Sequence, residues 1–110
     1  EGPPVRSRLA RSARLRPAIR KFSGRLDEQM VAIEAAFAKE DMHELAQLAH
    51  WLKGAAGTVG YDDFTKPAAR LELAAKENRT ADAGAALEEV RSLAARIEAP
   101  EEEPATAVPA

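Results

Sequence analysis

The 110-residue chain is long enough for one domain with a modest hydrophobic core, and 45% of its residues are hydrophobic and 31% charged. Aromatic residues make up only 5%, and alanine is far commoner than the β-branched residues, which favours helices over strands. The absence of cysteine excludes disulfides, thiolate metal sites and a cysteine nucleophile. No apolar run reaches the roughly 20 residues of a membrane span, and no signal-peptide pattern is present.

Charge is distributed unevenly along the chain. Residues 1–25 contain eight arginine or lysine residues and one glutamate, a net charge of +7, so the whole-chain charge of -2 leaves -9 for residues 26–110. An arginine-rich segment can bind nucleic acid or an anionic membrane. The acidic remainder would repel both, so we expect a solvated linker and helix face, with no nucleic-acid partner and no membrane contact.

The first two predicted helices follow from a helical spacing of apolar residues. One covers residues 16–39, with Pro17 tolerated in its first turn. The next begins after Asp41, a good N-cap residue, and Glu44 completes a capping-box-like start. Gly60 ends this second helix.

Two further helices complete the pattern. Asp62 or Asp63 caps the third, and we expect its start to be irregular or kinked because Pro67 lies late for a first turn. Residues 78–80 form a turn in which Thr80 caps the last helix. The predicted core consists of Leu15, Ile19, Phe22, Leu26, Met30, Ile33, Phe37, Leu45, Leu48, Leu52, Ala55, Val59, Phe64, Ala68, Leu71, Ala75, Ala83, Leu87, Val90, Leu93 or Ala94, and Ile97.

Four amphipathic helices with short connections predict an all-α fold, an antiparallel up-down four-helix bundle, and no segment predicts a strand. The bundle covers residues 15–99. Residues 1–14 form a basic linker or a short additional helix over residues 5–13, and both readings remain open. Residues 100–110, rich in acid and proline, form a disordered tail.

His50 is the candidate functional residue. At about 100° per residue it lies nearly opposite the apolar stripe of the second helix and faces solvent. Gly54 and Gly57 share this outer face, and each helix-interior glycine costs about 1 kcal/mol relative to alanine. We therefore interpret the face as a flat docking surface for a partner protein, to which Ala46 and Gln47, about one turn before the histidine, also contribute.

Two neighbours of His50 can act on it directly. Lys53 can place an ammonium near an anion held by the imidazole. Gln47 can hydrogen-bond the ring and select a tautomer, although an unpaired surface glutamine is an equal alternative. His43 lies on the same face without a following Lys-Gly pair, and we interpret it as a solvated residue. A zinc site shared by the two histidines is excluded because they are about 10.5 Å apart along the helix axis.

A neutral imidazole nitrogen is a good nucleophile, and a bare, positively assisted histidine suits phosphoryl transfer between proteins. The sequence has no Walker-type or kinase motif and no obvious carboxylate cluster beside His50. We therefore expect a phosphoryl acceptor rather than a self-contained enzyme, with no metal site or cofactor of its own.

The segment HWLKG followed by Gly60 resembles the H-x-x-K-G-x-x-x-x-x-G signature of histidine-containing phosphotransfer (HPt) domains, particularly the C-terminal ones of bacterial hybrid sensor kinases. The similarity extends over residues 15–22 and 68–75. It implies that a receiver-domain aspartyl phosphate phosphorylates His50, usually on Nε2. It also implies that Lys53 neutralises the phosphate, that Gly54 clears the approach, and that the receiver supplies Mg²⁺.

The resemblance leads us to expect a phosphorelay intermediate that docks response-regulator receivers, monomeric as an isolated domain. We expect it to be cytoplasmic, as part of a larger hybrid kinase that can tether it to the inner membrane. The alternative from another class is a non-phosphorylated helical interaction module that docks receiver-like partners through the same small-residue face.

Overall fold

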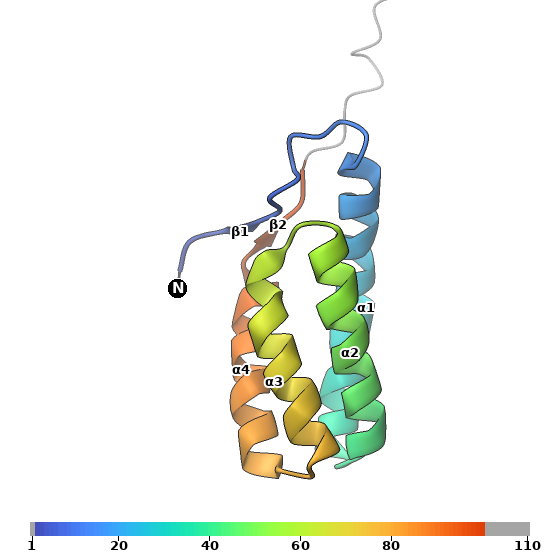
Figure 1. Cartoon of the computed structure of the whole chain (residues 1–110), viewed down its shortest axis with the longest axis vertical. Coiled ribbons are helices and arrows are strands. Elements are labelled where there is room, and N and C mark those ends of the chain that lie inside the picture. The colour runs from blue at the N-terminus through green and yellow to red at the C-terminus, as the bar shows by residue number, and fades with distance from the viewer. Residues whose placement is uncertain (1, 101–110) are drawn as a thin grey trace, which may run out of the picture.

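In the computed structural model, which describes residues 2–100, the helices run up and down side by side in an elongated bundle (Figure 1). This confirms the predicted all-α antiparallel four-helix bundle. The helices of the described part are α1 (Arg16–Ala38), α2 (Met42–Thr58), α3 (Thr65–Lys76) and α4 (Thr80–Ala95), with a 3-10 turn, η1 (Asp62–Phe64), before α3. None of the helices within residues 2–100 has both the length and the apolar character that crossing a membrane requires.

The first two helices agree with their predicted boundaries to within one or two residues. Helix α1 ends one residue earlier than predicted, and Pro17 lies in its first turn, where a missing N–H leaves no helical hydrogen bond unmade. At the start of α2, the Asp41 side chain accepts a hydrogen bond from the backbone N–H of Glu44 at 3.1 Å. Gly60 follows α2 with a φ of +86°, a left-handed conformation that glycine adopts without strain.

The predicted caps of the last two helices are wrong. Neither η1 nor α3 has a side-chain cap, and Asp62 instead accepts a hydrogen bond from Arg8 Nε at 2.7 Å. The irregular start expected from Pro67 takes the form of η1, which places the proline in the first turn of α3. Thr80 is the first residue of α4 rather than its cap.

The N-terminal segment packs on the bundle, and the short helix considered for residues 5–13 is not formed. Instead β1 (Val5–Arg6) pairs in parallel with β2 (Ile97–Glu98), a two-residue ladder that the sequence did not predict. Val5 is buried, and Ser7 Oγ donates a hydrogen bond to the carbonyl of Val59 at 2.5 Å. This segment thereby fastens the loop between α2 and α3. The predicted tail lies, apart from residue 100, outside the described residues.

The core is formed mainly by the predicted residues, but the buried face of α2 contains alanines that were not predicted to be buried. Ala49 and Ala56 are fully buried beside Leu45 and Leu52, whereas Leu48 is only half-buried. Alanines on this face allow α2 and α3 to pack closely, which brings polar side chains at the edge of the α2–α3 contact within hydrogen-bonding distance. The other predicted core residues that remain half-buried are Leu15, Met30, Phe37, Ala55, Leu93, Ala94 and Ile97.

Candidate functional site

His50 projects from the middle of α2, and 70% of its side chain is exposed, as the helical phase predicted. In the turns of α2 that follow His50, Gly54 and Gly57 carry no side chain. A Cβ added to Gly54 or Gly57 would meet nothing within 4 Å beyond the helix's own backbone. The imidazole is therefore accessible along α2 toward the helix C-terminus.

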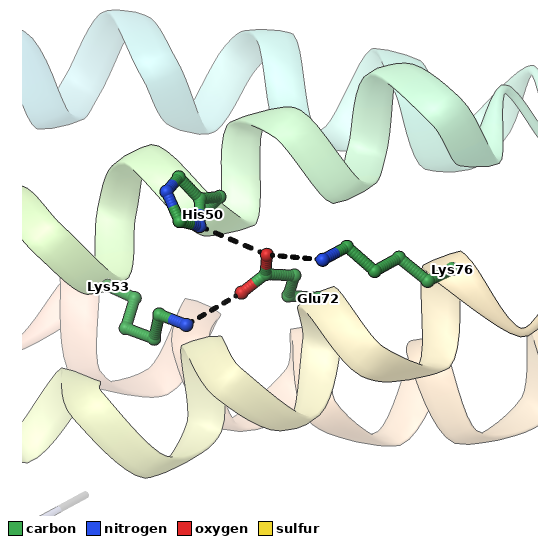
Figure 2. Close-up of polar contacts among 4 residues, drawn as sticks. All are labelled: His50, Lys53, Glu72 and Lys76. Atoms are coloured by element: carbon green, nitrogen blue, oxygen red, sulfur yellow. Dashed lines mark hydrogen bonds and ion pairs between the residues drawn. The ribbon is translucent and has the colours of Figure 1, made fainter.

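Glu72 of α3, which the sequence analysis did not select, lies directly beneath the histidine (Figure 2). Its side chain is only 8% exposed. Oε2 lies 3.0 Å from His50 Nδ1, and Oε1 lies 2.9 Å from Lys53 Nζ. Lys76, one turn further along α3, places its ammonium 3.1 Å from Oε2. One carboxylate thus joins a histidine and two lysines from two helices.

The groups that donate hydrogen bonds to this carboxylate keep it ionised. The Lys53 ammonium contributes most, followed by Lys76 and His50, and together they outweigh the effect of burial and lower the pKa of Glu72 from 4.5 to about 2. An ionised carboxylate only accepts hydrogen bonds, so the hydrogen of the His50–Glu72 contact belongs to Nδ1. In the neutral imidazole, Nε2 is then the nitrogen with the free lone pair, and Figure 2 shows it pointing away from the carboxylate.

Two predicted docking residues lie differently from their expected places. Ala46 is only 7% exposed, so its expected position on the outer face is wrong. It instead lines an open groove of about 630 Å³ between α2 and α3, together with Met42, Ala75 and His50. The sequence did not indicate the burial of Ala46, because α2 is rich in alanine and small apolar residues occur on both faces of the helix.

The hydrogen bond considered between Gln47 and the ring of His50 is not formed. Gln47 Nε2 lies 3.3 Å from Nε2 of His43, one turn earlier. The tautomer of His50 is therefore set by Glu72 from the neighbouring helix. His43 is exposed like His50, but it contacts the amide of Gln47 rather than a carboxylate.

A signal for Glu72 was present in the sequence. The residue lies among the predicted core positions Ala68, Leu71 and Ala75, where a carboxylate is rarely buried without a partner. Its partners could not be identified from spacing within one helix, because they follow from how α2 packs against α3.

The described helical bundle presents an exposed histidine that contacts a buried carboxylate and lies beside a lysine, an arrangement suited to carrying a phosphoryl group. The family model described as the Hpt domain matches residues 18–100, well over half of the chain, and the protein belongs to this family. It accordingly has a histidine phosphotransfer role in two-component signalling, as a phosphocarrier rather than a catalytic enzyme, and Hpt domains interact with receiver domains in phosphorelays. Neither a curated protein nor a solved structure matches the chain significantly.

Proposed function

We propose that His50 is the phosphoryl acceptor of a phosphorelay: it takes the phosphoryl group from an aspartyl phosphate of one receiver domain and passes it to the aspartate of another. The observation that carries this proposal is the contact of the exposed His50 side chain, through Nδ1, with the buried carboxylate of Glu72, which in the neutral imidazole leaves the lone pair on Nε2. His43 is exposed on the same helix without such a carboxylate contact in the described structure.

The transfer step follows from this tautomer. The lone pair of Nε2 forms a bond to phosphorus while the bond from phosphorus to the aspartate oxygen breaks and its electron pair leaves with the carboxylate. The imidazole ring becomes an N-phosphoryl imidazolium, with Nδ1 still carrying its hydrogen. Glu72, at 3.0 Å from Nδ1, stabilises the positive charge on the ring. Attack by a second receiver's aspartate on the phosphorus reverses the same step.

Lys53 and the glycines serve the approach of the partner in this proposal. The Lys53 side chain is 36% exposed, so its ammonium can turn from Glu72 toward a phosphoryl group on His50. Gly54 and Gly57 leave open space in which a receiver can bring its active site to Nε2. The groove that Ala46 and Gln47 line beside His50 extends the contact surface.

The proposal assigns Mg²⁺ to the receiver domain and no cofactor to this chain. It also places the domain in the cytoplasm, as a monomer when isolated and as part of a hybrid histidine kinase. These elements rest on the family role and on the resemblance to the C-terminal HPt domains of such kinases.

Incubation with a receiver carrying labelled phosphate tests the proposal. The domain should acquire label that is labile in acid and stable in base, as expected of a phosphohistidine. His50→Gln should abolish this label, whereas the matched variant His43→Gln should retain it. Label that persists in His50→Gln would refute the assignment.

A second candidate is a docking module that binds receiver-like partners without phosphotransfer, and the apolar residues of the groove, Met42, Ala46 and Ala75, favour it. In that case His50→Gln and Lys53→Met would leave receiver binding unchanged, and no phosphotransfer would be detected.

A further inference from the structure

Lys53 is engaged before any phosphoryl group arrives. Its Nζ lies 2.9 Å from Oε1 of Glu72, and this ammonium is the largest influence on the carboxylate's ionisation. Figure 2 shows the Lys53 ammonium at the carboxylate and Nε2 of His50 on the far side of the ring, so contact with a phosphoryl group on Nε2 draws Lys53 away from this ion pair. The release of Lys53 is therefore part of forming a stable phosphohistidine.

When Lys53 leaves, the buried carboxylate of Glu72 loses an ion pair. The Glu72 side chain is 8% exposed, and a buried carboxylate that loses one of its cations is less stable, even with the phosphorylated ring of His50 still beside it. The same carboxylate must also stay ionised to stabilise the positive ring of phosphorylated His50 through Nδ1. A second cation that remains on Glu72 would remove this obstacle.

Lys76 occupies that position. Its Nζ lies 3.1 Å from Oε2, and it stands four residues after Glu72 on the same helix, so its contact does not depend on how α2 moves. Figure 2 shows Lys53 and Lys76 reaching the carboxylate from different sides, with the free ring nitrogen of His50 pointing away from Lys76.

We infer that Lys76 is a positioning residue for the phosphorylated state, holding the charge of Glu72 so that Lys53 can leave it for the phosphoryl group. This inference rests on the proposed function of His50. It distinguishes two lysines that contact one carboxylate: Lys53 acts on the phosphoryl group, and Lys76 acts only through Lys53.

The test uses the domain phosphorylated chemically with phosphoramidate, in which the bond to Nε2 forms as the phosphorus–nitrogen bond breaks and ammonia leaves. The second pKa of the phosphoryl group is then measured by following its ³¹P chemical shift with pH. An ammonium in contact with the phosphoryl group favours the dianion and lowers this pKa. The pKa therefore reports whether Lys53 has moved, independently of any receiver.

In Lys76→Met, Lys53 should stay on Glu72, so the phosphoryl pKa should rise by about half a unit toward the value of Lys53→Met. Lys76→Arg should restore the wild-type value. Lys66→Met, an exposed lysine on the same helix, is the matched control and should change nothing. Because 62% of the Lys76 side chain is exposed, none of these substitutions should unfold the domain.

A double variant separates the indirect action from a direct one. Adding Lys76→Met to Lys53→Met should produce no further rise, because Lys76 acts through Lys53. An additive rise, or an unchanged pKa in Lys76→Met alone, would overturn the inference and leave the phosphorylation of His50 intact. A wild-type domain that takes no phosphoryl group at His50 would overturn the proposed function as well.

Discussion

Replacing Glu72 with methionine removes both the negative charge and the hydrogen-bond acceptor beneath His50 while keeping a side chain of similar length. Methionine suits a position that is only 8% exposed, so the fold should be retained. The lysines that lose their partner, Lys53 and Lys76, are 36% and 62% exposed and can be solvated. The variant therefore isolates the effect of the carboxylate on the imidazole.

The size of the effect follows from the geometry. A hydrogen bond to a charged group contributes roughly 1.5–3 kcal/mol, and water competing at a ring that is 70% exposed lowers this to about 1 kcal/mol. The preference for the Nδ1–H tautomer should thus fall by about fivefold in Glu72→Met. The ring also becomes positively charged during transfer, so the total loss should be about 2 kcal/mol, or a roughly thirtyfold slower phosphorylation of His50.

Two assays measure these losses: ¹⁵N chemical shifts of the His50 ring give the tautomer, and quenched-flow phosphotransfer from a phosphorylated receiver gives the rate. Glu89→Met, which removes an exposed ion pair with Arg70 away from His50, is the matched control and should leave both unchanged. A Glu72→Met domain with the wild-type tautomer and a rate within about twofold of wild type would refute the assigned role of the carboxylate.

Three further predictions concern the glycines and acid stability. Gly60→Ala should lower the free energy of unfolding, measured by thermal unfolding, by about 2–3 kcal/mol, because a Cβ there would lie 2.8 Å from Ser7 Oγ at a φ of +86°. Gly57→Ala, in open space inside α2, should instead raise it by about 0.5–1 kcal/mol. Equal effects of the two substitutions would contradict this reasoning. Gly54→Leu should not lower the melting temperature but should slow receiver phosphotransfer about tenfold, and an unchanged rate would show that the open face is not used. The Glu72 ion pairs, with a pKa lowered from 4.5 to about 2, should contribute fully above about pH 4.5 and be lost as the pH falls toward 2, so denaturant titrations of Glu72→Met should show a flatter decline over this range than wild type.

Local signals accounted for most of the fold. The Asp41 cap, the position of Gly60 and the period of the α1 apolar stripe are properties of short segments, and the structure has them where the sequence predicted them. The prediction of helix caps was wrong where a tertiary contact competed for the side chain, as at Asp62, whose carboxylate pairs with Arg8 instead. The pairing of β1 with β2 was also missed, because a two-residue ladder depends on how the folded chain brings residues 5–6 beside residues 97–98 rather than on a strand pattern.

The site was predictable on one helix and not across two. The outward phase of His50 and the proximity of Lys53 follow from positions along α2. The burial of Ala46 depends on how closely α2 approaches its neighbours, and the carboxylate partner depends on the register between α2 and α3. No spacing rule within α2 identifies Glu72.

The position of the phosphoryl group on the protein tests the central claim most directly. After transfer from a phosphorylated receiver, heteronuclear NMR that correlates phosphorus with the imidazole ring should show one phosphoryl group, on Nε2 of His50, with Nδ1 still protonated toward Glu72. A phosphoryl group on Nδ1 of His50, on His43, or on no histidine at all would contradict the account.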